Sequence, residues 1–133
     1  ANSRCVHQAD APDALGAAPD GAFVLVMTHS HALDLAIVHK ALAACRFGYV
    51  GLIGSASKRA RFLRLLAEAG VEGTVSAALH SPIGLPGIRS KLPAVIAASV
   101  ASDLLIRDEA ARLAAPSRAE AHPMLSLRSP RGS

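Results

Sequence analysis

The chain has 133 residues, 51% of them hydrophobic, and a net charge of +4 that comes from 14 Lys and Arg against 10 Asp and Glu. This length fits one domain with one core, and the mainly aliphatic composition suits helices packed on a small parallel sheet. With 3% aromatic residues and no Trp, the chain nearly lacks the stacking platforms of single-stranded nucleic-acid sites, and no apolar run reaches the ~20 residues of a membrane span.

The first predicted elements are short. Residues 4–7 could form a strand, and the Ala- and Pro-rich stretch that follows can hold at most a short helix between Pro12 and Pro19. The apolar run over residues 23–27 has no polar interruption, which predicts a strand covered on both faces.

Two strand-to-helix transitions follow. A helix is expected over residues 31–45, because its apolar residues recur at helical spacing and either Thr28 or Ser30 can supply the capping oxygen. A second strand over residues 47–53 leads through a tight turn into a helix over residues 57–69. The expected inner face of this helix comprises Phe62, Leu65, Leu66 and Ala69, and its stop is Gly70.

The remaining elements are a short helix and a long one. Residues 73–79 are predicted to be helical, and residues 80–87 form a loop with two prolines and two glycines. Pro93 suits the first turn of a long helix that continues to about residue 113. Residues 116–133 contain few large apolar side chains and are expected to be a disordered tail.

The alternation of strands and helices with short connections predicts parallel strands joined by right-handed crossovers. The expected class is α/β, a Rossmann-like three-layer sandwich with a small parallel sheet. We expect one such domain over residues 1–115, followed by the tail.

The segment over residues 51–59 is the most informative for function. Its glycine turn ends a buried strand, so the backbone can approach a ligand closely, and the next helix points its unpaired N–H groups at the same place. These features favour the binding of an anion such as a phosphate at Gly51, Gly54 and Ser55. Lys58 and Arg59 add positive charge in the first helical turn. The alternative is an ordinary capped turn beside a solvated basic face.

Residues 28–34 occupy the equivalent position after the first long strand. Thr28, His29, His31 and Asp34 should therefore face the same crevice at the carboxyl ends of the strands. The two histidines with the carboxylate could in principle bind zinc, but no other nearby ligand completes such a site. Capping and hydrogen-bonding roles are the better interpretation.

A third loop contains Pro82, whose ring is rigid, and Gly84, which tolerates unusual backbone angles. This combination favours a fixed loop beside a ligand; the alternative is that the loop merely closes the edge of the sheet. No G-x-S-x-G motif is present and no nucleophile has an obvious base, so no catalytic residue is expected. The chain also lacks G-x-G-x-x-G and a P-loop, so an intact dinucleotide site is not claimed.

Taken together, residues 26–34, 49–62, 82–85 and 93–99 resemble the carboxyl-terminal domain of the xanthine dehydrogenase accessory protein (XdhC/CoxF) family. The resemblance covers roughly residues 7–105. It implies a protein that binds the molybdenum cofactor (molybdopterin), supports its sulfuration by a cysteine desulfurase, and hands it to the xanthine dehydrogenase apoenzyme. The predicted anion would then be the phosphate of molybdopterin. The cofactor-binding candidates are Thr28, His29, His31, Asp34, Gly51, Gly54, Ser55, Lys58, Arg59, Pro82 and Gly84.

The sequence departs from the family pattern at its amino end. The opening strand-turn-helix unit, with its glycine-rich turn, is missing, so the chain is expected to be a truncated Rossmann domain. An apolar edge exposed in this way predicts a partner chain or a homo-oligomer.

Two other functions stay open. The α/β pattern permits a fragment of an NAD(P)-dependent oxidoreductase, although the glycine-rich turn and the ribose-binding acid are absent. The net charge permits nucleic-acid binding, against which the few aromatic residues argue. Cys5 and Cys45 are isolated, and no signal peptide is visible, so we expect free thiols in a soluble cytoplasmic protein without a membrane partner.

Overall fold

The computed structural model describes residues 3, 5–6 and 10–114. In chain order, the elements are η1 (Ala11–Ala17), β1 (Phe23–Val26), α1 (His31–Ala44), β2 (Tyr49–Leu52), α2 (Ala56–Glu68), α3 (Gly73–Ser76), β3 (Leu79–His80) and α4 (Pro93–Ala114). They fall into two units, Ala1–Ile83 and Gly84–Ser133, here called the sheet unit and the α4 unit. The predicted tail lies outside the described residues, and the predicted domain boundary stays a prediction.

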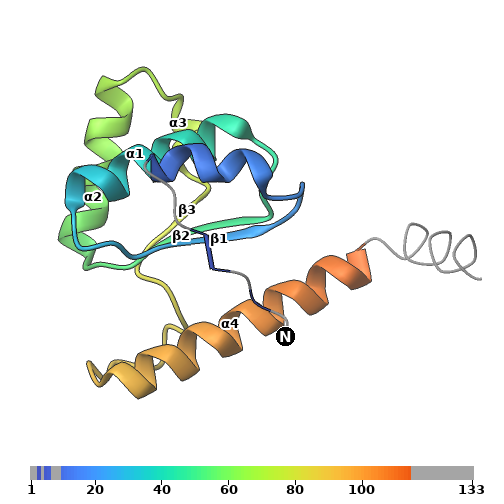
Figure 1. Ribbon diagram of the computed structural model, residues 1–133. Coiled ribbons are helices and arrows are strands. Elements are labelled where there is room, and N and C mark those ends of the chain that lie inside the picture. Colours follow the sequence, from blue (N-terminus) through green and yellow to red (C-terminus); the bar gives the residue numbers. More distant parts are fainter. Residues whose placement is uncertain (1–2, 4, 7–9, 115–133) are drawn as a thin grey trace, which may run out of the picture. The chain divides into compact units, whose positions relative to one another are not determined.

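A parallel sheet organises the sheet unit (Figure 1). Its strand order is β1-β2-β3, with Phe23 opposite Tyr49 in one ladder and Val50 opposite Leu79 in the other. Helices alternate with these strands along the chain, which confirms the predicted Rossmann-like α/β class. The helix that would supply a third layer, α4, belongs to the other unit, so the three-layer arrangement stays a prediction.

The hydrophobic core lies between one face of this sheet and the helices α1 and α2 (Figure 1). Successive strand side chains point to opposite faces, and the alternate residues of the three strands enter this core. Its buried members are Val26, Val38, Ala41, Leu42, Val50, Leu52, Phe62, Leu66 and Leu79. Each large aliphatic or aromatic side chain buried here stabilises the fold by about 1.5–3 kcal/mol.

Among the other strand residues, Phe23, Tyr49 and His80 form an aromatic row. The ring of Tyr49 lies 5.7 Å from that of Phe23 and stacks on His80 at 4.7 Å between centroids. A Cβ on Gly51 would come within 2.5 Å of the Tyr49 ring. Gly51 therefore belongs to the interior of β2, where it makes room for this tyrosine.

Helix α1 begins and ends close to the predicted positions. Of the two candidate caps, Ser30 is the one used, and its Oγ accepts a hydrogen bond from the Leu33 N–H at 3.2 Å. At the other end, Cys45 adopts the left-handed conformation with φ of 52° and its N–H donates to the Leu42 carbonyl. Such a turn satisfies a carbonyl that the last helical turn leaves free.

Helix α2 is capped in the same way by Ser55, whose Oγ accepts from the Lys58 N–H at 3.2 Å. Phe62 and Leu66 are buried, as predicted. The prediction that Ala69 lies on the inner face is wrong, because the helix ends at Glu68 and Ala69 is exposed as the chain turns at Gly70.

The third strand was not predicted. The helix expected over residues 73–79 stops at Ser76, and the chain then pairs with β2 through Leu79 and His80. A two-residue strand is too short to show an alternating pattern, and only the packing of Leu79 in the core fixes it. The strand expected over residues 4–7 falls partly outside the described residues, and Cys5 and Val6 are not in a strand.

The α4 unit consists of the glycine-containing loop and the long helix predicted from Pro93. Gly84 has φ of 98°, and a Cβ there would come within 2.6 Å of the Ser99 Oγ. That oxygen accepts the Leu85 N–H at 2.7 Å, which fastens the loop to the helix. Among the described residues, no helix has the length and apolar character needed to cross a membrane.

Candidate functional site

Three loops follow the carboxyl ends of the three strands. Residues 27–30 follow β1, residues 53–55 follow β2, and residues 81–83 follow β3. Because the strands are parallel, these ends lie at one edge of the sheet. The turns around His29 and Ser55 therefore share an edge, as the sequence predicted. This edge is called the rim below.

A buried carboxylate joins the first two loops. Asp34 is 0% exposed. Its Oδ1 accepts hydrogen bonds from the Thr28 N–H at 2.9 Å and from the Thr28 Oγ1 at 2.7 Å, and its Oδ2 accepts from the Lys58 Nζ at 3.0 Å. The same ammonium donates to the Ile53 carbonyl at 3.0 Å. One ion pair thus links the loop after β1 to the loop after β2.

The surroundings of Asp34 keep it charged. Burial on its own raises the pKa of this carboxyl group, but the hydrogen bonds from Thr28 and Lys58, together with the positive charge of Lys58, outweigh burial and lower the pKa below its ordinary value. Asp34 is therefore a carboxylate at neutral pH, and the pair with Lys58 is a true ion pair.

Lys58 points inward. Its side chain is 13% exposed, and its ammonium lies 5.5 Å from the centre of the Phe62 ring. A Cβ on Gly54 would come within 2.5 Å of the Lys58 Cδ. Because glycine has no side chain, the space through which the Lys58 side chain runs stays open. The cation that the sequence assigned to a ligand has internal partners in the structure.

Donors remain at the helix starts. The first N–H groups of a helix have no intrahelical acceptor. In α2, Ser55 accepts from Lys58 and Arg59 through its side-chain and main-chain oxygens. Within the described part of the chain, the N–H groups of Ala56 and Ser57 have no hydrogen-bond acceptor.

The basic and imidazole side chains of the rim are more open. Arg59 is half-buried and makes no ion pair with the described residues. His29 and His31 are exposed, and His31 meets the Phe62 ring edge-on at 6.5 Å. These three side chains are thus more accessible than Asp34 and Lys58.

The other predicted site residues, Pro82, Gly51 and Gly84, do not join the cluster at the rim. Pro82 is exposed in the loop after β3. Gly51 is inside β2 beneath Tyr49, and Gly84 belongs to the α4 unit, where it contacts Ser99. The structure thus brings together Thr28, His29, His31, Asp34, Gly54, Ser55, Lys58 and Arg59.

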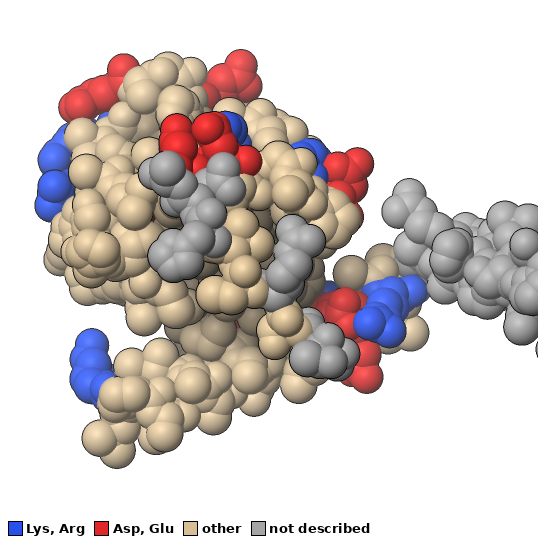
Figure 2. Space-filling model, viewed as in Figure 1, with Lys and Arg blue, Asp and Glu red and all other residues tan. Residues whose placement is uncertain are grey.

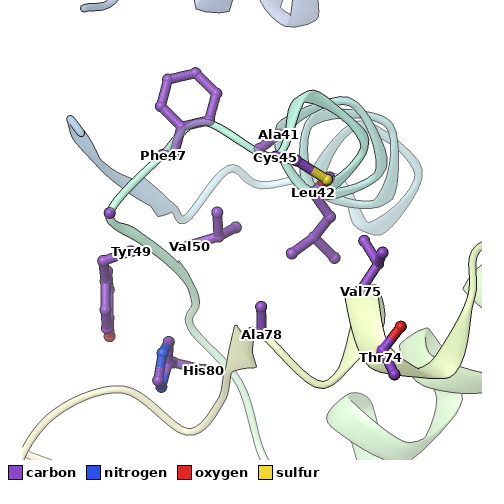
Figure 3. A pocket seen from close by; sticks show the side chains of 11 residues that line it. Ala41, Leu42, Cys45, Phe47, Tyr49, Val50, Thr74, Val75, Ala78 and His80 are labelled. Carbon is purple, nitrogen blue, oxygen red and sulfur yellow. The ribbon is translucent and has the colours of Figure 1, made fainter. Parts of the chain in front are cut away.

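A cavity of about 360 Å³ lies at the opposite end of the sheet unit, near the amino end of β2 (Figure 3). None of the predicted site residues lines it. Its walls come from Ala41, Leu42, Cys45, Phe47, Gly48, Tyr49, Val50, Thr74, Val75, Ala78 and His80. The Cys45 thiol donates to the Leu42 carbonyl at 3.3 Å. The lining is apolar apart from a few hydroxyl, thiol and imidazole groups, and it contains no Lys, Arg, Asp or Glu side chain.

No group of three or more His, Cys, Asp or Glu side chains in the described ranges could hold a metal ion. Asp34, the carboxylate nearest to the two rim histidines in sequence, is directed to Thr28 and Lys58. Figure 2 shows basic side chains next to acidic ones on the visible face of the sheet unit, without a continuous basic surface.

Sequence reasoning missed two contacts in this region. The pairing of Asp34 with Lys58 spans 24 positions, and the stacking of His80 on Tyr49 depends on the unpredicted third strand. The loops at the carboxyl ends of parallel strands lie close together, and this rule could have indicated the first contact. Asp34 and Lys58 both lie in the first turn of the helix that follows such a loop. Nothing in the residue pattern signalled the second.

A family model described as the XdhC Rossmann domain matches residues 1–104 of the chain. No curated protein matches the chain. The match includes the three strands, the rim and the first half of α4.

Proposed function

The chain belongs to the XdhC family, and on that premise we propose that it binds the molybdenum cofactor by holding the phosphate of molybdopterin at the rim. Family membership implies an accessory role in the maturation of xanthine dehydrogenase. The finer steps belong to the proposal: the chain protects the cofactor, supports its sulfuration by a cysteine desulfurase, and delivers it to the apoenzyme.

One observation carries this proposal. Two long helices, α1 and α2, begin at neighbouring strand ends, and each has its own serine cap. A helix start carries a partial positive charge and unpaired N–H groups, which together suit an anion. The N–H groups of Ala56 and Ser57 and the guanidinium of Arg59 are donors without acceptors in the described residues. This donor set fits a phosphate group.

The buried carboxylate does not oppose such a ligand. Asp34 is fully buried and its charge is balanced by Lys58 at 3.0 Å. A carboxylate turned toward the ligand would repel a phosphate, whereas this one faces the protein interior. When bound, the molybdenum cofactor would supply redox chemistry.

A binding measurement tests the proposal. Molybdopterin released from a molybdoenzyme is titrated into the 133-residue chain under anaerobic conditions, and its fluorescence gives the Kd. Replacement of Arg59 by Ala should weaken binding about tenfold or more, since a charge-assisted hydrogen bond contributes about 1.5–3 kcal/mol. Arg64→Ala is the matched control, because Arg64 is exposed on the same helix five residues further on.

The two variants separate local from general effects. Equal weakening by Arg59→Ala and Arg64→Ala would indicate that only net charge matters, which contradicts a site at the rim. Absence of molybdopterin binding by the unchanged chain would contradict the proposal outright.

A further inference from the structure

We propose that Asp34 and Lys58 are positioning residues that fix the spacing of the two helix starts, and that Lys58 does not itself contact the bound anion. This inference rests on the proposed function, because it assigns roles within the same rim. The juxtaposition that motivates it is a salt bridge of 3.0 Å between a fully buried carboxylate and an ammonium that is largely covered.

The ammonium of Lys58 has little capacity left for a ligand. It has three N–H donors, and two acceptors, Asp34 Oδ2 and the Ile53 carbonyl, lie at 3.0 Å. The ammonium also lies 5.5 Å from the centre of the Phe62 ring, and the Lys58 side chain is only 13% exposed. A phosphate that bound Lys58 would have to draw the ammonium out and leave Asp34 as an uncompensated buried charge, which is costly.

The glycine turn serves this ion pair. A Cβ on Gly54 would approach the Lys58 Cδ to 2.5 Å. The glycine that the sequence associated with close approach of a phosphate therefore allows close approach of the lysine stem. The turn and the salt bridge form one structural unit.

A continuous series of hydrogen bonds connects the two caps through this pair. The Ser30 N–H donates to Thr28 Oγ1 at 3.1 Å, and Thr28 Oγ1 in turn lies 2.7 Å from the Asp34 carboxylate. On the other side, the Lys58 N–H donates to the cap oxygen of Ser55 while its ammonium holds Asp34. The start of α1 is thereby tied to the start of α2.

The division of roles follows. Asp34 and Lys58 set where the N–H groups of Ala56 and Ser57 stand, and these groups with Arg59 meet the anion. Hydrogen bonds weaken steeply when their donors move away from the preferred distance and angle. The pair therefore influences affinity without touching the ligand.

The variant Asp34→Asn distinguishes positioning from direct contact, because the two models predict opposite changes. If Lys58 contacted the anion, loss of its partner would free the ammonium and tighten binding. If the pair positions the rim, binding should weaken about tenfold. The Kd for inorganic phosphate, measured by NMR titration of the full chain, gives the readout. Asp13→Asn is the control, since it makes the same charge change at an exposed salt bridge with Lys40.

A second variant covers the event that Asp34→Asn does not fold. The double replacement Asp34→Asn with Lys58→Met removes both charges, so the net charge is unchanged and no buried charge is left alone. It should also bind phosphate about tenfold more weakly than the unchanged chain. Phosphate binding equal to or tighter than that of the unchanged chain, in either variant, overturns the inference.

The amide resonances separate this inference from the proposed function. In the free protein, either variant should shift the signals of Ser55 and Ala56 as well as those near Thr28, because the pair couples both loops. Unchanged signals at Ser55 and Ala56 overturn the positioning role. Absence of phosphate binding by the unchanged chain overturns the anion site and, with it, the proposed function.

Discussion

The two ends of the sheet unit differ in the chemistry that holds them together. At the carboxyl end, a buried ion pair and two serine caps satisfy the starts of α1 and α2. At the amino end, the cavity of about 360 Å³ has no Lys, Arg, Asp or Glu in its lining. The buried ion pair thus lies where helices begin after strands, whereas the pair of Arg46 with Asp20 at the amino end is more exposed.

The difference has a simple physical origin. A helix start exposes N–H donors with a partial positive charge. Oxygen acceptors are therefore needed at the end of the sheet where helices begin, and an anion is stabilised there. The amino end meets the last turn of α1, where Cys45 closes the helix through its own backbone. There, Arg46 donates to the Leu15 and Ala18 carbonyls and pairs with Asp20. The anion binding that we propose therefore belongs to the carboxyl end.

Lys58→Met should cause the largest loss of stability. It leaves Asp34 buried without its counter-charge, and breaking a buried pair in this way costs about 3–5 kcal/mol. The free energy of unfolding, measured by urea denaturation near pH 7, checks this. Arg64→Met, on the exposed face of the same helix, should change stability by less than about 0.5 kcal/mol. Equal effects of the two variants would show that the pair contributes nothing specific.

Leu42→Ala tests the opposite end. Leu42 is 4% exposed and lines both the core and the cavity, so truncation should cost about 3 kcal/mol through lost apolar contact and a larger void. This cost should be the same at pH 7 and pH 3, because no titrating group is removed. A marked pH dependence would mean that the two ends are not independent.

Acid should weaken the carboxyl end selectively. Because the pKa of Asp34 is lowered in the folded protein, its contribution is fully present above the unfolded pKa of about 3.9 and is lost as the pH falls through the folded pKa. Between pH 5 and pH 2, the unchanged chain should therefore lose more stability than Asp34→Asn. Parallel pH profiles of the two proteins would contradict the lowered pKa.

The caps should give the smallest effects. Ser30→Ala or Ser55→Ala removes the acceptor for one N–H group at a helix start, which costs about 1 kcal/mol. Ser57→Ala, which changes an exposed serine in the first turn of α2 that accepts no such bond, should cost much less. Thermal unfolding followed by circular dichroism compares the three variants, and an equal cost at Ser57 would argue against capping as the cause.

The sequence by itself determined the α/β class, both long strands, the helices that follow them and the long helix from Pro93. It left the cap of α1 open between Thr28 and Ser30, and it offered a capped turn at Ser55 only as an alternative to a phosphate site. The features that it determined depend on local signals, namely uninterrupted apolar runs and helical spacing, which act within a few residues. The rule that parallel strands deliver their turns to one edge also predicted that the residues around His29 and Ser55 share a rim.

Only the tertiary structure decided which residues contact one another across the rim and the sheet. The lysine expected at the ligand pairs with Asp34 across 24 positions, and the glycine expected beneath the phosphate makes room for that lysine. The short strand at Leu79 exists because the core and the neighbouring strand hold it. Contacts of this kind depend on distances between segments far apart in the chain, and no local pattern of residue types encodes those distances.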